Sequence, residues 1–159
     1  MDETTPKTAP VDPPRGFHQG RVDEKGRLKL PAVFQEYLAK SGVDSLFITT
    51  MDRSTTKLYT KADWAANEAF FASPGEEAAE WADAVQFCAN HYGADSSIDG
   101  QGRVLVPQEL RRDLGIENQP VWLVNEKGVI TVYGEQMYQQ KLAAMPAAVL
   151  TSLIALEHD

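Results

Sequence analysis

The sequence predicts an α+β fold in which two β-α-β units, related by a pseudo-twofold axis, share a small β-barrel core. A helical connector and C-terminal helices complete it. Three observations predict this fold: an internal duplication, short segments of alternating apolar and polar residues, and helical periodicity around them. The chain has 159 residues, of which 43% are hydrophobic, enough for one domain or two small ones. A unit of about 40 residues buries too little surface alone, so we expect the copies to share one core.

The duplication is carried by the pattern Asp-x-x-Gly-Arg-x-x-x-Pro, which occupies residues 23–31 and returns at residues 99–107, at an offset of 76 residues. The match extends at the same offset to apolar positions and to one strand-like segment: Leu28/Val104, Leu30/Val106, Phe34/Leu110, Leu38/Leu114 and 46–49/122–125. A second strand-like segment, 57–59, matches 131–133, with two residues deleted in the second copy. Because such a spaced identity followed by matching apolar positions is improbable by chance, the chain contains a tandem repeat.

Each copy contains the same series of strands. One strand leads into a polar turn that contains glycine, and a short strand follows it. The short strands are expected at Arg27–Leu30 and Arg103–Val106. Two further strands close each unit, at 46–50 with 57–60 and at 121–125 with 129–133, and residues 125–128 read as a hairpin turn.

A helix is expected after the short strand of each copy. Pro31 and Pro107 stand in the first turn of these helices, where proline is tolerated. Apolar residues recur behind them at helical spacing, and Gly42 and Gly115 follow as helix-ending glycines.

The patterns divide the chain into five segments. Residues 1–15 form a Pro- and Thr-rich extension for which we expect disorder. The others are the first repeat (16–60), a helical connector (61–91), the second repeat (92–134) and the C-terminal helices (135–159).

The connector is expected to hold two helices. Thr60 is placed to cap the first, through Trp64 to Phe71. The second is expected over Glu76–His91, with Trp81, Val85 and Cys88 on one face.

The C-terminal segment is expected to form two helices separated by Pro146. The first covers Glu135–Met145 and the second Ala147–Leu156. The second is too apolar for a solitary exposed helix, which leaves two alternatives: packing onto its own domain, or contact within an oligomer.

The net charge of −8 and the sequence pI of about 4.9 argue against nucleic acid when the chain is taken as a whole. The charge is unevenly distributed, however, because the connector is strongly acidic and residues 16–59 carry a net positive charge. Arg27 and Lys29 alternate with Leu28 and Leu30, so the two cations share the outer face of a strand. Four cations lie within nine residues: Arg21, Lys25, Arg27 and Lys29.

The duplicated turn allows two interpretations. Asp23 and Asp99, each four residues before an arginine, are placed to orient it through a bidentate pair or an Asx-type turn. The turn is then either a structural feature whose polar groups bind only one another, or a means of holding Arg27 and Arg103 ready to bind phosphate or guanine. Lys25 adds a cation to the first turn, where the second has Gln101.

Other classes of function find little support. No apolar run is long enough to span a membrane, and the N-terminus does not resemble a signal peptide. Cys88, the single cysteine, excludes an internal disulfide, and Cys88 with His91 provides too few ligands for a zinc site. Motifs for calcium, dinucleotides, phosphate loops and a nucleophilic serine are incomplete, so we expect no enzyme activity, metal, cofactor or small-molecule substrate.

The two Asp-x-x-Gly-Arg-x-x-x-Pro copies, the strand pairs ending at Tyr59 and Tyr133, Trp64 and the helical connector resemble the MraZ family, which is built from two AbrB/SpoVT-type half-domains. The resemblance covers residues 16–142. It implies a bacterial, cytoplasmic, nucleoid-associated transcription regulator. Such regulators bind short direct repeats in double-stranded promoter DNA upstream of the division and cell-wall gene cluster, and they assemble into homo-oligomeric rings.

Carried over by position, the resemblance implies that DNA is contacted through the paired turns. The expected DNA-binding residues are Arg27, Arg103, Lys25, Gln101, Lys29 and Arg21, and the residues that structure the turns are Asp23, Gly26, Asp99 and Gly102. The alternative is a non-enzymatic AbrB-like interaction or assembly module that does not bind DNA.

Overall fold

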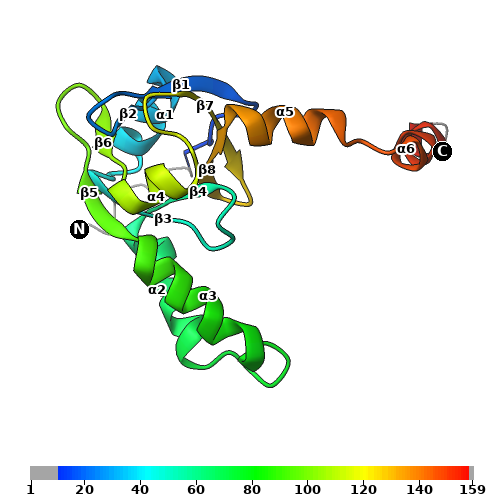
Figure 1. The fold of residues 1–159 in the computed structure, drawn as a ribbon, viewed down its shortest axis with the longest axis horizontal. Helices are drawn as coiled ribbons and strands as arrows, with labels where there is room; N and C mark the ends of the chain where they lie inside the picture. The colour runs from blue at the N-terminus through cyan, green and yellow to red at the C-terminus, as the bar shows by residue number, and fades with distance from the viewer. Residues whose placement is uncertain (1–10, 158–159) are drawn as a thin grey trace, which may run out of the picture.

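The computed structural model describes residues 11–157, and the disorder expected for residues 1–10 falls outside that range. The two repeats follow the same order of elements (Figure 1). The first contains β1 (His18–Val22), β2 (Arg27–Lys29), α1 (Ala32–Lys40), β3 (Ser45–Thr49) and β4 (Thr56–Tyr59). The second contains β5 (Ala94–Ser97), β6 (Arg103–Leu105), α4 (Gln108–Asp113), β7 (Pro120–Glu126) and β8 (Val129–Gly134). The connector forms α2 (Lys61–Ala72) and α3 (Ala79–Tyr92), and the C-terminal segment forms α5 (Glu135–Ala143) and α6 (Ala147–Glu157).

The eight strands of residues 11–157 form one antiparallel sheet in the order β5-β3-β4-β8-β7-β1-β2-β6. The edge strands β5 and β6 contact each other, so the sheet is a nearly closed barrel. The predicted α+β class with a barrel-like core is confirmed.

The two repeats interlock through their strands. β1 of the first repeat pairs with β7 of the second, and β5 of the second pairs with β3 of the first. The equivalent strands β2 and β6 pair with each other, as do β4 and β8. If β5 and β6 are taken as neighbours, exchanging the repeats leaves the order of strands around the barrel unchanged. Neither repeat can therefore complete its part of the sheet without the other.

The core lies inside this barrel and receives equivalent residues from both copies. Leu28 and Val104 face each other across β2 and β6, and both are fully or almost fully buried. The largest side chains buried there come from both repeats and include Leu30, Phe34, Leu46, Ile48, Leu110 and Leu123. The shared core follows from the short strands of each copy, in which apolar residues that point inward alternate with polar residues that point outward.

The helix ends follow local rules. Pro31 and Pro107 occupy the residue before the first helical residue, one position earlier than expected, and extend the backbone there. Thr60 caps α2, because its Oγ1 accepts the backbone N–H of Asp63 at 3.1 Å. Gly42 ends α1 with φ of +73°. These local signals are confirmed, with the prolines shifted by one residue.

The connector forms a helical hairpin that projects from the barrel (Figure 1). Helix α3 begins at Ala79, not at the expected Glu76, because Gly75 has a positive φ and turns replace the helix over 76–78. Its packed face is made of small residues such as Ala82 and Ala89, whereas Trp81 is half exposed. Of the three residues expected on one face, Val85 and Cys88 pack partly against the core, and the ring of Trp81 lies 5.6 Å from that of Phe70 on α2.

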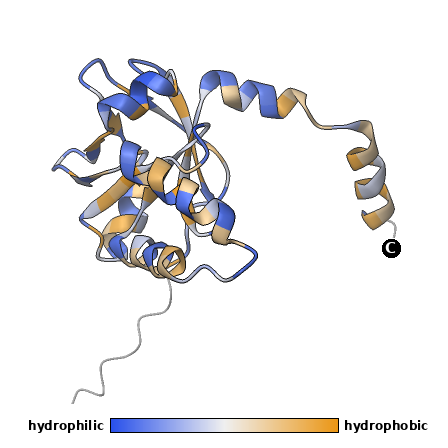
Figure 2. Ribbon diagram, turned by 60° about the horizontal axis from the view of Figure 1, so that its bottom comes forward, coloured by the Kyte–Doolittle hydropathy of each residue, from blue (hydrophilic) through white to orange (hydrophobic). Residues whose placement is uncertain are grey.

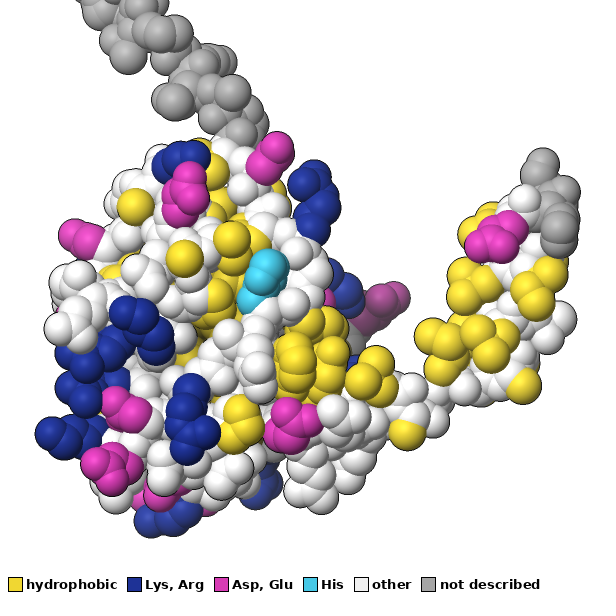
Figure 3. Space-filling view, turned by 90° about the horizontal axis from the view of Figure 1, so that it is seen from above, with side chains coloured by type: hydrophobic (Ala, Val, Ile, Leu, Met, Phe, Trp, Pro, Cys, Tyr) yellow, Lys and Arg dark blue, Asp and Glu magenta, His cyan; other side chains and the backbone are white. Residues whose placement is uncertain are grey.

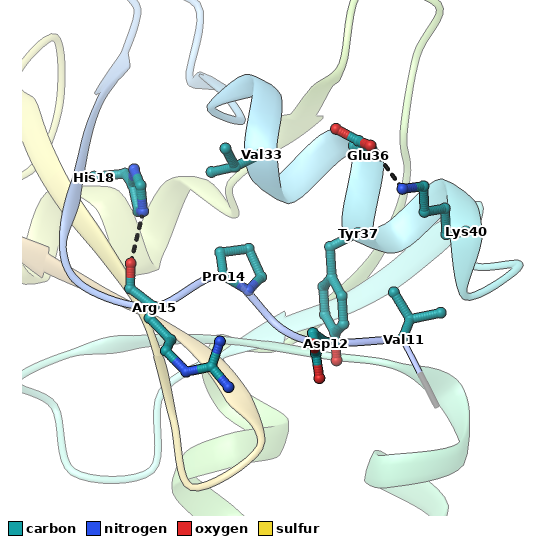
Figure 4. A pocket seen from close by; sticks show the side chains of 9 residues that line it. All are labelled: Val11, Asp12, Pro14, Arg15, His18, Val33, Glu36, Tyr37 and Lys40. Carbon is teal, nitrogen blue, oxygen red and sulfur yellow. Dashed lines mark hydrogen bonds and ion pairs between the residues drawn. The ribbon is translucent and has the colours of Figure 1, made fainter. Parts of the chain in front are cut away.

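Residues 11–15 have no helix or strand and lie along α1 (Figure 4). Together with that helix they line an open pocket of about 340 Å³, with Val11 and Pro14 on one side and Val33 and Tyr37 on the other. The expected extension thus includes a segment that contacts the first repeat.

The C-terminal helices leave the barrel as an arm (Figures 1 and 2). Helix α5 is anchored at its base, where Tyr138 stacks on Trp122 with ring centroids 4.4 Å apart and Trp122 Nε1 donates to Glu135 at 2.8 Å. Helix α6 lies beyond it, apolar and without a buried residue. Of the two alternatives, packing onto its own domain is not observed. None of the helices described has the length and apolar content needed to cross a membrane.

Candidate nucleic-acid interface

Two equivalent turns precede β2 and β6, and we call residues 23–26 the first turn and residues 99–102 the second turn. In the first, Asp23 Oδ1 accepts the backbone N–H groups of Lys25 and Arg27, both at 2.9 Å. Asp23 Oδ2 accepts Nε of Arg27 at 2.9 Å. The carboxylate therefore holds both the backbone of the turn and the arginine side chain.

The second turn repeats this arrangement. Asp99 Oδ1 accepts the N–H groups of Gln101 and Arg103 at 2.8 and 2.9 Å, and Asp99 Oδ2 accepts Nε of Arg103 at 3.0 Å. Of the two geometries expected from sequence, the Asx-type turn is present, and the arginine adds one Nε bond in place of a bidentate pair.

The bonds to the carboxylates leave the outer ends of both arginines available. Among residues 11–157, the hydrogen bonds of the Arg27 and Arg103 side chains involve Nε alone. The two Nη groups of each guanidinium therefore form the donor edge that can bind a phosphate or the O6 and N7 atoms of guanine. Both side chains are partly exposed, at 34% for Arg27 and 26% for Arg103.

The carboxylates are stabilised in their charged form. The backbone N–H of Arg27 lowers the pKa of Asp23 from its ordinary value of 3.8, and the Arg27 side chain and the Lys25 N–H act in the same direction. The backbone N–H of Arg103 likewise lowers the pKa of Asp99. Both turns are therefore charged pairs at neutral pH.

The glycines of the turns are required for two reasons. Gly26 and Gly102 have φ of +85° and +75°, values that favour glycine. A Cβ at Gly26 would overlap the guanidinium of Arg111, and a Cβ at Gly102 would overlap the amide of Gln35. Each turn thus packs against a side chain from the helix of the other repeat.

We call these contacts, of Arg111 with the first turn and of Gln35 with the second, the cross-brace. It is duplicated like the turns, because positions 35 and 111 are also 76 residues apart. Gln35 Nε2 donates to the carbonyl of Leu30 at 2.6 Å, and Arg111 Nη1 donates to the carbonyl of Val106. The backbone joins in, since the N–H of Leu30 donates to Gly102 O and the N–H of Val106 donates to Gly26 O, both at 2.9 Å. The turns are therefore fixed relative to each other.

Between the turns, β2 and β6 form a two-stranded antiparallel ribbon, whose exposed side we call the ribbon face. Arg27 lies opposite Leu105, and Lys29 lies opposite Arg103. These four side chains share the ribbon face because Leu28 and Val104, between them, point into the core. Arg27 and Arg103 therefore occupy one face, in a diagonal relation and not directly opposite each other.

Arg21 and Lys29 extend the same row of cations. Arg21 on β1 lies opposite Lys29 on β2, which lies opposite Arg103 on β6. The guanidinium of Arg21 is bound to Asn118, through the backbone carbonyl at 3.1 Å and through Oδ1 at 3.0 Å. The ammonium of Lys29 contacts the carbonyl of Gln101 in the second turn.

The structure brings the residues singled out from the sequence into one region of the surface. The ribbon face carries Arg27, Lys29 and Arg103, while Lys25 and Gln101 are exposed at the tips of the turns. Two residues were missed: Arg111, which packs on the first turn, and Leu105, which is 54% exposed on the ribbon face. The offset of 76 would have paired Arg111 with Gln35 and Leu105 with Lys29, but it does not reveal that helices and turns exchange partners.

The cations are unevenly distributed over the surface. Figure 3 shows the densest group of Lys and Arg side chains on the side of the barrel away from the C-terminal arm, with Asp and Glu among them. The acidic α2–α3 hairpin projects from the barrel away from the two turns (Figure 1). A polyanion can therefore approach the ribbon face without meeting the hairpin.

Cys88 and His91 on α3 remain as the pair weighed as metal ligands. No group of three or more His, Cys, Asp or Glu residues within 11–157 could hold a metal ion. Cys88 donates to the carbonyl of Thr50 at 3.6 Å, and burial raises the pKa of its thiol.

Known proteins similar to this chain are named transcriptional regulator MraZ. One from Acidobacterium capsulatum is 36% identical over 127 residues, which cover 78% of this chain and 77% of that protein. Another, from Koribacter versatilis, is 33% identical over 107 residues, covering 66% and 71%. A third, from Thioalkalivibrio sulfidiphilus, is 26% identical over 149 residues, covering 87% and 97%. No family model matches the chain.

The duplicated barrel, its exposed cationic ribbon and these relatives together define the class of protein: the chain is a transcriptional regulator. The similarity extends over more than two thirds of each of the first two relatives at above 30% identity. The chain therefore belongs to the MraZ family.

Proposed function

We propose that this chain is a sequence-specific DNA-binding regulator that places its ribbon face in the major groove of promoter DNA. The observation that carries the proposal is the pair of identically held arginines, Arg27 and Arg103, on one exposed two-stranded ribbon. The major groove admits a two-stranded ribbon, and a guanidinium with both Nη groups available matches the acceptor edge of guanine. Lys25, Lys29 and Arg21 supply further positive charge for phosphates.

The two repeats correspond in this proposal to AbrB/SpoVT-type half-domains that together form one DNA-reading unit. The interlocked strands and the cross-brace support it, because they hold the two turns in a fixed spacing. A fixed spacing limits the loss of conformational entropy when both turns meet DNA at once.

Affinity is expected to come from several subunits acting together. One chain offers few cations, and its net charge is −8, so a single subunit binds DNA weakly. Subunits joined in a homo-oligomeric ring would bind a series of short direct repeats with a high effective concentration. The exposed apolar helix α6 supports self-association, because a helix that is apolar on every side is normally buried.

The family membership supports a target upstream of the division and cell-wall gene cluster, and with it a cytoplasmic, nucleoid-associated protein that acts on double-stranded DNA. A role as a protein-interaction module without DNA binding is the competing hypothesis. It predicts that the two arginines serve only the turns.

Electrophoretic shift on the DNA upstream of the chain's own gene tests the proposal. Wild-type protein should bind this DNA in preference to a scrambled duplex of equal length. Affinity should fall steeply with salt, because each phosphate contact contributes a slope of about −0.9 in a plot of log K against log salt. A probe with several repeats should bind far more tightly than a probe with one. Equal binding to the scrambled duplex would contradict sequence-specific recognition.

A further inference from the structure

Leu105 is the apolar residue among the four side chains of the ribbon face. Its three neighbours there are the cations Arg27, Lys29 and Arg103, yet Leu105 is 54% exposed. The strand prevents it from turning inward, because Val104 and Val106 on either side of it are buried. Single exposed leucines are common on protein surfaces, so it is the position of Leu105 that matters.

The position breaks the symmetry of the two repeats. Leu105 is equivalent to Lys29, and the two copies otherwise match closely in burial from residue 25 to 31 and from residue 101 to 107. The backbone N–H of Leu105 donates to Ser96 Oγ at 2.8 Å, which fixes the strand at this point. With a cation at both position 29 and position 105, the ribbon face would look the same to DNA when the two repeats are exchanged. This face instead presents an ammonium group on β2 and an isobutyl group on β6.

We infer that Leu105 is a specificity-determining residue that contacts the C5-methyl group of a thymine beside the base read by Arg27. This inference rests on the proposed function, since it requires the ribbon face to lie in the major groove. The thymine methyl is the apolar feature of the major-groove edge, and apolar side chains contact it. This contact would fix the orientation of each subunit along the DNA, because only the second repeat has the apolar side chain.

The register fixes where the methyl should be found. Residues directly opposite in an antiparallel pair have Cβ atoms about 5 Å apart, and Leu105 lies opposite Arg27. Successive bases on a strand are about 3.4 Å apart along the duplex. The thymine is therefore expected within two base steps of the guanine bound by Arg27.

Replacement of thymine by deoxyuridine removes only this methyl group and tests the inference directly. Duplexes of the upstream DNA would carry deoxyuridine at one thymine position at a time, changed in every repeat, and binding would be measured by fluorescence anisotropy. Wild-type protein should lose affinity by about fourfold or more at one such position, the factor expected for burial of one methyl group. Leu105→Ala should bind the original and the deoxyuridine duplex equally.

Two further variants complete the test. Leu105→Lys, which restores the symmetry with Lys29, should bind more tightly at low salt and should also be insensitive to deoxyuridine. Phe87→Ala removes another exposed apolar side chain, on α3, and should keep the wild-type response. If wild-type protein binds the duplex but no thymine position responds, or if Leu105→Ala still responds, the inference is overturned and the proposed function stands. If wild-type protein binds no duplex, both are overturned.

Discussion

The cross-brace between the first turn and α4 makes a quantitative prediction about Gly26→Ala. At a φ of +85°, alanine adopts the left-handed region at a cost of about 1–2 kcal/mol. The new Cβ would also displace the guanidinium of Arg111, which then loses its hydrogen bond to Val106, worth about 1 kcal/mol. The free energy of unfolding should therefore fall by about 2–3 kcal/mol.

A double-mutant cycle with Arg111→Ala separates the two contributions. With the Arg111 side chain absent, Gly26→Ala should cost only the backbone part, so the coupling energy should be about 1 kcal/mol. Gly42→Ala is the matched control, because its φ is +73° and no atom lies within 4 Å of the added Cβ. Its coupling to Arg111 should be zero. Urea unfolding followed by circular dichroism measures the free energies of wild type, the three single variants and the two double variants. A coupling of zero between Gly26 and Arg111 would refute the cross-brace.

Three further predictions concern the turns and the helices. The pKa values of Asp23 and Asp99 are lowered in the folded protein, so both carboxylates stabilise the fold at pH values above the ordinary pKa of 3.8, and this contribution is lost as the pH falls below it. Between pH 5 and pH 3 the urea midpoint should therefore fall less in Asp23→Asn/Asp99→Asn than in wild type. An equal fall in both proteins would exclude these groups as a cause. Truncation after Ala144 removes α6, which has no buried residue, so light scattering should show a smaller assembly while the free energy of unfolding stays within about 0.5 kcal/mol of wild type. An unchanged mass would argue against α6 as an oligomer contact. Thr60→Ala removes the N-cap of α2 and should cost about 1 kcal/mol in urea unfolding, and a cost of zero would show that the bond to Asp63 contributes nothing.

The turns could be predicted from sequence because their determinants are local. Asp23 and Arg27 are four residues apart within one turn, and Gly26 between them permits the positive φ that closes it. The duplication then predicted the same turn at Asp99. The cap at Thr60 and the helix end at Gly42 depend on neighbouring residues in the same way.

The contacts between the repeats could not be predicted, because the offset of 76 relates positions without saying which of them touch. Gln35 packs on the second turn and Arg111 on the first, so each helix serves the turn of the other copy. The register of β2 and β6 places Arg27 opposite Leu105, a pairing that depends on the closed barrel. The position of α6 away from the barrel likewise has no local signal.

Whole-chain charge was the least informative part of the sequence. The net charge of −8 includes the acidic α2–α3 hairpin, which projects away from the turns, whereas the ribbon face carries three cations. In this fold, the charge of the surface that faces a binding partner says more about that partner than the net charge of the whole chain.

The binding of Arg27→Ala/Arg103→Ala to the upstream DNA is the most direct test of whether Arg27 and Arg103 bind DNA through the ribbon face. The control Lys40→Ala/Lys61→Ala removes the same charge from exposed positions on α1 and α2. Light scattering would show that all three proteins have the same oligomeric mass. The arginine variant should bind at least about thirtyfold more weakly than wild type, because each bidentate contact is worth about 1–3 kcal/mol, while the control should bind nearly as wild type does. Wild-type affinity in the arginine variant would show that these two side chains do not bind DNA.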